Sequence, residues 1–273
     1  MYDFYFGTPE EIIRDPKRFL LTIKRMLPRW CNSIPDSEYL AIHDLLAAVT
    51  LPERPVLVET GSGASTIVLC YWALATNGEL YTWDIDGAKL AYLRGVLNDT
   101  LMRHFTDRNL HNHWKYVAFS STSPHAGIPM LGELGKRVSA CFLDSEHTLD
   151  TLMTEVRFLT PLLSDAALVC IDDGNYAYVH HNTAYINMVR RKQGLPPIPE
   201  APGNLGQRFW QEVQHHLQHS FRSVEYLNDP YKQTYRSDLF WSYFRADRET
   251  MAGLQMEKTE DLEHRFDAWR VHR

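Results

Sequence analysis

Four apolar segments that each end in acidic residues constrain the fold of this chain more than any other feature. The segments are residues 55–58 before Glu59, 80–83 before Asp84, 140–143 before Asp144, and 167–171 before Asp172 and Asp173. A short apolar run that stops at a turn is typical of a strand buried on both faces. Helical patterns separate these runs, and strands that alternate with helices indicate a parallel sheet covered on both faces.

The remaining segments complete an α/β architecture. Residues 115–119 are predicted to form a further strand, and residues 221–227 and 238–244 an antiparallel pair, which gives a mostly parallel seven-stranded sheet. Helices are predicted at 37–49, 66–75, 88–102, 149–163, 177–192, 205–219 and from 249 to the end. We expect residues 1–36 to be an N-terminal appendage, and residues 37–273 a single domain with an insertion near 177–206.

Composition excludes several classes of function. The net charge of −6 argues against a protein that binds a phosphate backbone, so no nucleic-acid partner is expected. No signal peptide is expected, because residues 1–4 do not begin a basic stretch followed by an apolar region, and no apolar run is long enough to cross a membrane. The four cysteines lack the spacing of metal ligands. These features predict a cytoplasmic protein without a membrane partner, and they leave the oligomeric state open, a homo-oligomer included.

The turn after the first strand is the candidate cofactor site. Gly61-Ser62-Gly63 follows the strand directly, and glycines there let a ligand approach the backbone and the next helix N-terminus. The third glycine of the dinucleotide pattern is missing, which speaks against a nicotinamide or nucleotide-sugar enzyme. Glu59 stands two residues before Gly61, and Asp84 lies 21 residues after Gly63. An anionic pair suits a sulfonium better than a pyrophosphate.

At these residues the sequence resembles the class I S-adenosylmethionine-dependent methyltransferases, which have a Rossmann-like fold. The resemblance covers roughly residues 37–176. It implies that the Glu59 to Gly63 turn, with Ser62, holds the methionine end of S-adenosylmethionine, and that Asp84 binds the ribose. Ser120 or Ser121, after the third strand, would lie beside the adenine.

The acids after the fourth and fifth strands form a second candidate site. Asp144, Asp172 and Asp173 would gather at one sheet edge, and clustered carboxylates suit a hard divalent cation such as Mg²⁺. His147, three residues after Asp144, is the candidate general base, because histidine can take a proton near neutral pH. The alternative is structural, because aspartate at a strand end is often a helix cap or a turn residue.

This pattern is similar to that of the metal-dependent O-methyltransferases, both catechol O-methyltransferase and the macrocin-type sugar enzymes. The resemblance implies that Asp144, Asp172 and Asp173 bind the metal and that His147 is the base, although the chain has Asp-Asp where the macrocin type has Glu-Asp. The expected activity is metal-assisted O-methylation of a small sugar or natural-product hydroxyl. A metal-free methyltransferase acting on an amine or hydroxyl, and a non-catalytic Rossmann-like binding module, are the alternatives.

Overall fold

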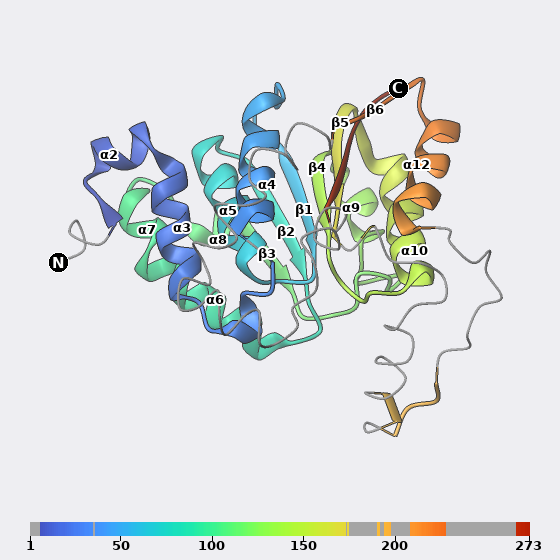
Figure 1. The fold of residues 1–273 in the computed structure, drawn as a ribbon, viewed down its shortest axis with the longest axis horizontal. Helices are drawn as coiled ribbons and strands as arrows, with labels where there is room; N and C mark the ends of the chain where they lie inside the picture. Colours follow the sequence, from blue (N-terminus) through green and yellow to red (C-terminus); the bar gives the residue numbers. More distant parts are fainter. Residues whose placement is uncertain are drawn as a thin grey trace, which may run out of the picture.

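A seven-stranded sheet forms the centre of the described chain, with the strand order β3-β2-β1-β4-β5-β7-β6 (Figure 1). The computed structural model describes residues 6–34, 36–172, 174, 190–191, 194–197, 208–227 and 266–273. The strands are β1 (Val56–Thr60), β2 (Glu79–Trp83), β3 (Trp114–Val117), β4 (Val138–Leu143), β5 (Leu163–Ile171), β6 (Ser223–Tyr226) and β7 (Asp267–His272). Strands β1 to β5 are parallel, and β7 runs antiparallel to both β5 and β6. The predicted Rossmann-like fold, a mostly parallel seven-stranded sheet with an antiparallel pair toward the C-terminus and helices on both faces, is confirmed.

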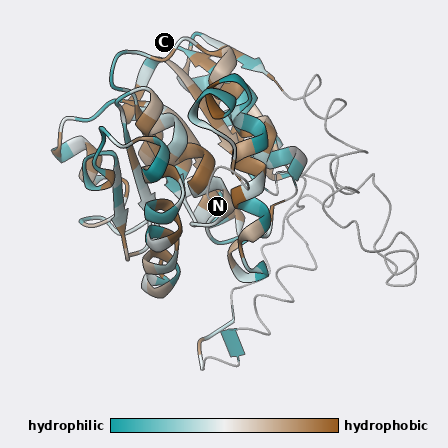
Figure 2. Cartoon of the chain, turned by 90° about the vertical axis from the view of Figure 1, so that its left-hand side faces the viewer, coloured by the Kyte–Doolittle hydropathy of each residue, from teal (hydrophilic) through white to brown (hydrophobic). Residues whose placement is uncertain are grey.

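Helices cover both faces of this sheet (Figure 1). On one face lie α2 (Pro9–Arg14), α3 (Pro16–Met26), α4 (Asp36–Ala48), α5 (Ala64–Ala75), α6 (Gly87–Asp99), α7 (Leu101–His104) and α8 (Leu110–His113). On the other lie α9 (Met130–Glu133), α10 (Leu149–Leu159) and α12 (Phe209–Ser220). Successive strand residues point to opposite faces, so Leu57 joins the first core, and Val56 and Val58 join the second. Hydrophobic colouring accordingly concentrates between the layers (Figure 2).

The N-terminal helices pack into the same core as α4 and α5. Phe19, Leu20 and Ile23 of α3 are fully buried there. A buried ion pair also joins α3 to α4, with the Lys24 ammonium 3.0 Å from the Asp36 carboxylate. A short 3-10 helix, η1 (Arg29–Cys31), follows α3, and its Cys31 lies beside Gly63 in the turn after β1.

Two helix predictions beside the sheet are wrong, one in its C-terminal boundary and one in its type of structure. The helix predicted at 149–163 ends at Leu159, because Pro161 lies in a 3-10 turn (Thr160–Leu162) that leads directly into β5. The final residues were predicted to be helical, yet residues 267–272 form β7 between β5 and β6. The burial of Trp269 and Val271 explains the difference, because packing against the sheet outweighs local helix propensity. Residues 238–244 and 177–189 lie outside the described residues.

All four cysteines are free thiols and all four are buried. Within the described ranges, no helix combines the length and the apolar character that a membrane span requires.

Candidate functional site

The turn after β1 requires glycine at its first position. Gly61 has a φ of +77°, and a Cβ added there would lie 1.7 Å from the backbone oxygen of Asp144. The backbones at the ends of β1 and β4 also bond directly, since the Asp144 N–H donates to the Thr60 carbonyl at 2.8 Å. Gly63 is extended and meets Cys31 of η1. The turn is therefore held between β4 on one side and the N-terminal segment on the other.

Glu59 lies beneath this turn with its carboxylate fully buried. It accepts hydrogen bonds from the hydroxyls of Ser65 at 2.6 Å, Thr66 at 2.8 Å and Thr82 at 2.9 Å. Burial raises the pKa of Glu59 to about 7, and the three hydroxyl donors partly offset that rise. Glu59 thus ties β1, β2 and the start of α5 together from below.

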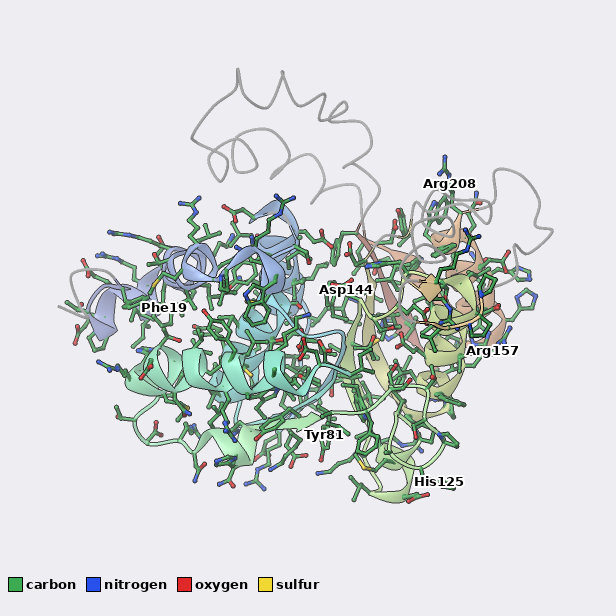
Figure 3. The ribbon with its side chains drawn as sticks, turned by 90° about the horizontal axis from the view of Figure 1, so that it is seen from below. Phe19, Tyr81, His125, Asp144, Arg157 and Arg208 are labelled. Atoms are coloured by element: carbon green, nitrogen blue, oxygen red, sulfur yellow. The ribbon has the colours of Figure 1, made fainter. Side chains whose placement is uncertain are left out.

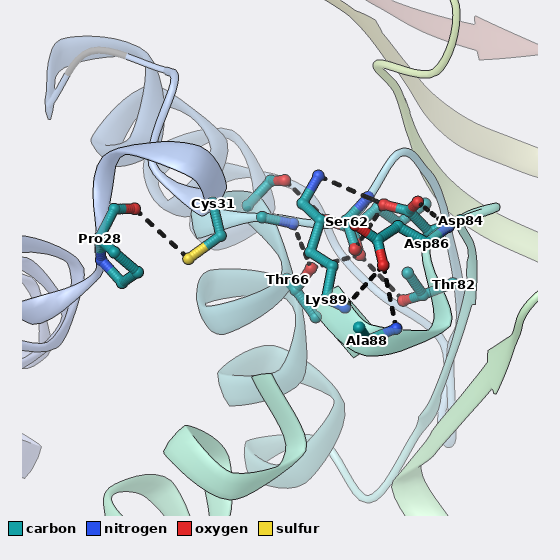
Figure 4. Close-up of polar contacts among 12 residues, drawn as sticks. Pro28, Cys31, Ser62, Thr66, Thr82, Asp84, Asp86, Ala88 and Lys89 are labelled. Carbon is teal, nitrogen blue, oxygen red and sulfur yellow. Dashed lines mark hydrogen bonds and ion pairs between the residues drawn. The ribbon is translucent and has the colours of Figure 1, made fainter. Parts of the chain in front are cut away.

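Asp84, at the end of β2, contacts the turn from the side (Figure 4). Its Oδ2 accepts from the Ser62 backbone N–H at 2.8 Å and from the Ser62 hydroxyl at 2.6 Å. Its Oδ1 accepts from the Asp86 N–H at 2.8 Å, and the Lys89 ammonium lies 3.3 Å from Oδ2. Burial favours a raised pKa, but these hydrogen bonds and the Lys89 charge outweigh it and lower the pKa of Asp84. The carboxylate is therefore held ionised.

A cavity of about 530 Å³ opens beside the turn, and we call it the strand-end cavity. Residues that follow β1, β2, β3 and β4 line it, among them the predicted residues Gly61, Asp84, Ser120, Ser121 and Asp144. Glu59, Ser62 and Gly63 are not among its lining residues. Figure 3 labels Asp144 near the middle of the molecule, between the side that carries Phe19 and the side that carries Arg157. The structure thus brings four predicted cofactor residues and one predicted metal ligand to a single space.

Two apolar side chains at the strand-end cavity were missed by the sequence reasoning. Ile85 is 82% exposed and Phe119 is 60% exposed, although both are large hydrophobic residues. Ile85 directly follows Asp84, and Phe119 directly precedes Ser120. Their position next to predicted site residues was the available signal. Lys89 and Arg190 add two cations to the lining of the same cavity.

The second predicted group lies at the ends of β4 and β5, which are neighbours in the sheet. Leu143 pairs with Ile171, and the Asp172 N–H donates to the Leu143 carbonyl at 3.0 Å. Asp144, His147 and Asp172 border a small hollow at this edge, where Asp172 is buried and His147 is exposed. Asp173 lies outside the described residues. Among the residues that are described, no group of three or more His, Cys, Asp or Glu side chains is arranged to hold a metal ion.

Glu155, a second buried carboxylate, was also missed. It lies on the packed side of α10 with the buried residues Leu152, Val156 and Leu159, and only 1% of it is exposed. Burial raises the pKa of Glu155 to about 7, against the effect of hydrogen bonds from three hydroxyls. The available signal was its helical spacing, which places an acid among apolar core positions.

The sequence of the central segment identifies the type of domain. Residues 58–174 match the family model of a methyltransferase domain, and this segment runs from β1 to the residue after Asp173. Residues 58–174 thus form a methyltransferase domain by sequence similarity. The match covers somewhat less than half of the chain, and it includes the turn, Asp84 and the ends of β4 and β5. No curated protein matches this chain by sequence.

Solved structures share parts of the fold at low sequence identity. Mycolic acid cyclopropane synthase CmaA1, complexed with SAH and CTAB, is 12% identical over 85% of this chain and 82% of its own, with a TM-score of 0.45. CalS11, a TDP-rhamnose 3'-O-methyltransferase of calicheamicin biosynthesis, is 16% identical over 74% of this chain and 94% of its own, with a TM-score of 0.42. An O-methyltransferase family protein from Burkholderia thailandensis is 9% identical over 97% of this chain and 63% of its own, with a TM-score of 0.46. At this level of similarity they say nothing about what this chain acts on.

Proposed function

We propose that the chain transfers a methyl group from S-adenosylmethionine to a hydroxyl of a small molecule of the sugar or natural-product type, and that a divalent cation assists. The observation that carries the proposal is the strand-end cavity, which Asp84 and Asp144 both border. Its volume of about 530 Å³ is in the range of small-ligand sites. A cofactor site and an acceptor site can therefore share one space.

The chemistry of the cavity fits S-adenosylmethionine. Asp84 is ionised and its Oδ1 has one described donor, so that oxygen has capacity to accept from a ribose hydroxyl. Ile85 and Phe119 offer apolar surface to the faces of an adenine ring, with Ser120 and Ser121 beside it. When bound, the cofactor supplies a sulfonium methyl group for in-line displacement by the acceptor oxygen.

The carboxylate oxygens of Asp144 and Asp172 are ligands of the kind that a hard cation prefers. Mg²⁺ usually takes one or two carboxylates from a protein and fills its other positions with water and substrate oxygens. The two described acids meet that requirement at adjacent strand ends, and Asp173 is the third proposed ligand. When bound, the cation would lower the pKa of the acceptor hydroxyl and orient it. His147, exposed at the same edge, is the proposed base that removes the hydroxyl proton.

A metal-free reaction on a hydroxyl or an amine is the second candidate. It is favoured by the finding that the described residues offer no group of three metal-binding side chains. Turnover after treatment with a chelator, measured before and after Mg²⁺ is restored, separates the two reactions. For the location of the enzyme we propose the cytoplasm, because four free, buried thiols fit a reducing compartment.

Calorimetric titration with S-adenosylhomocysteine tests the proposed cofactor site. The wild-type protein should bind it with a micromolar Kd, and Asp84→Asn should weaken binding at least tenfold because an ionised acceptor is lost. Asp86→Asn is the matched control, since Asp86 caps α6 and does not line the cavity. Wild-type protein that does not bind the compound, with or without Mg²⁺, refutes the proposal.

A further inference from the structure

Glu155 connects three separate segments that surround the strand-end cavity. Its carboxylate accepts hydrogen bonds from the hydroxyls of Thr60 at 3.1 Å, Ser145 at 2.7 Å and Ser121. Thr60 ends β1, Ser121 lies in the loop after β3, and Ser145 lies in the loop after β4.

The donors of Glu155 border the space where the cofactor is proposed to bind. Ser121 and Ser145 line the strand-end cavity, and Thr60 directly precedes Gly61, which also lines it. Glu155 itself does not line that cavity, so it acts on the cavity through these three residues. An apolar side chain at this position of α10 would pack against Leu152 and Val156 but would leave three buried or half-buried hydroxyls without their acceptor.

The arrangement differs from that around Glu59, the other buried carboxylate with three hydroxyl donors. The donors of Glu59 are Ser65, Thr66 and Thr82, and none of them lines the strand-end cavity. Two donors of Glu155 do line it. Glu59 therefore supports the turn from inside the core, whereas Glu155 fixes the relative positions of loops that form the wall of the cavity.

We propose that Glu155 is a positioning residue that holds the ends of β1, β3 and β4 in the arrangement required to bind S-adenosylmethionine. The inference rests on the proposed function, because it assumes that the cofactor occupies the strand-end cavity. Glutamine at this position keeps the size of the side chain, but its carbonyl oxygen has two acceptor sites and its NH₂ group must donate. It cannot accept from all three hydroxyls in their present orientation.

The test is a double-mutant cycle read by calorimetric titration with S-adenosylhomocysteine. Glu155→Gln and Ser145→Ala should each weaken binding, Glu155→Gln by tenfold or more. The double variant should bind about as weakly as Glu155→Gln alone, because the Ser145 hydroxyl acts through the carboxylate. Ser139→Ala is the matched control, since Ser139 is a buried serine of β4 that lines a different cavity. Its affinity should equal that of the wild-type protein.

Three outcomes overturn the inference. Equal affinity of Glu155→Gln and the wild-type protein, measured well below the melting temperature of both, shows a role in stability alone. Strictly additive losses in the double variant show that Ser145 acts independently of Glu155. If Glu155→Gln does not fold, Ser121→Ala and Ser145→Ala are measured alone, and unchanged affinity in both contradicts the inference. Failure of the wild-type protein to bind is different, because it refutes the proposed function itself.

Discussion

Replacing Glu59 by glutamine should change how the stability of the protein depends on pH. The carboxyl has a pKa of about 7 in the folded protein and an ordinary value of 4.5. The folded state therefore holds this proton more tightly than the unfolded chain does. Its contribution to the free energy of unfolding is complete below pH 4.5 and is lost as the pH rises through 7. Glu59→Gln removes this dependence because an amide has no charge to bury.

The two pKa values set the size of the effect. Between pH 5.5 and pH 8, the wild-type protein should lose roughly 2 kcal/mol of unfolding free energy through Glu59 alone. Glu59→Gln should not lose this free energy of unfolding. Between pH 5.5 and pH 8 its stability relative to the wild-type protein should therefore rise by about 2 kcal/mol. Other titrating groups, such as the buried His43, are present in both proteins and cancel in this difference.

Urea denaturation at both pH values measures this difference. Glu133→Gln is the matched control, because it makes the same change on an exposed side chain of α9. If the difference in unfolding free energy between Glu59→Gln and the wild-type protein does not change with pH, the folded protein does not favour the protonated carboxyl. A change in the opposite direction would mean that the three hydroxyl donors outweigh burial, and the reasoning would be refuted.

The other predictions concern the turn, the N-terminal core and the proposed base. Gly61→Ala should abolish S-adenosylhomocysteine binding in calorimetry, because its Cβ would overlap a backbone oxygen, whereas Gly135→Ala should bind normally, since the space around Gly135 is open. Asp36→Ala should destabilise the protein by about 3–5 kcal/mol in urea denaturation, because it removes the carboxylate that lies 3.0 Å from the buried ammonium of Lys24. His147→Ala should lower kcat by about 100-fold with unchanged S-adenosylhomocysteine affinity. Full turnover by this variant removes His147 from the mechanism.

The sequence predicted the parallel half of the sheet because local patterns determine it. The apolar runs before Glu59, Asp84 and Asp144 became β1, β2 and β4. Asp84 and Asp144 lie at the edge of one cavity, whereas Glu59 is buried within β1. Gly61 was predicted to need glycine because of a ligand, and the structure adds a further reason, the close approach of β4. Strand ends and turns could be predicted because both depend on a few neighbouring residues.

The features that were missed depend on contacts between distant segments. The strand character of β7 comes from its position between β5 and β6, while the charged residues before it favour a helix. The role of Glu155 requires three hydroxyls that lie 95, 34 and 10 residues away in sequence. Ile85 and Phe119 are exposed apolar residues, and their exposure is known only once the strands are placed.

The position of β7 has a consequence for how the chain folds. β6 has no direct partner among the parallel strands, since β7 separates it from β5. Until residues 267–272 insert, β5 presents an open, apolar edge, and β6 has nothing to pair with. Pairing β7 with β5 joins segments about one hundred residues apart in sequence, so this insertion should be a late step. The state before it has an unpaired strand edge, and such edges promote aggregation.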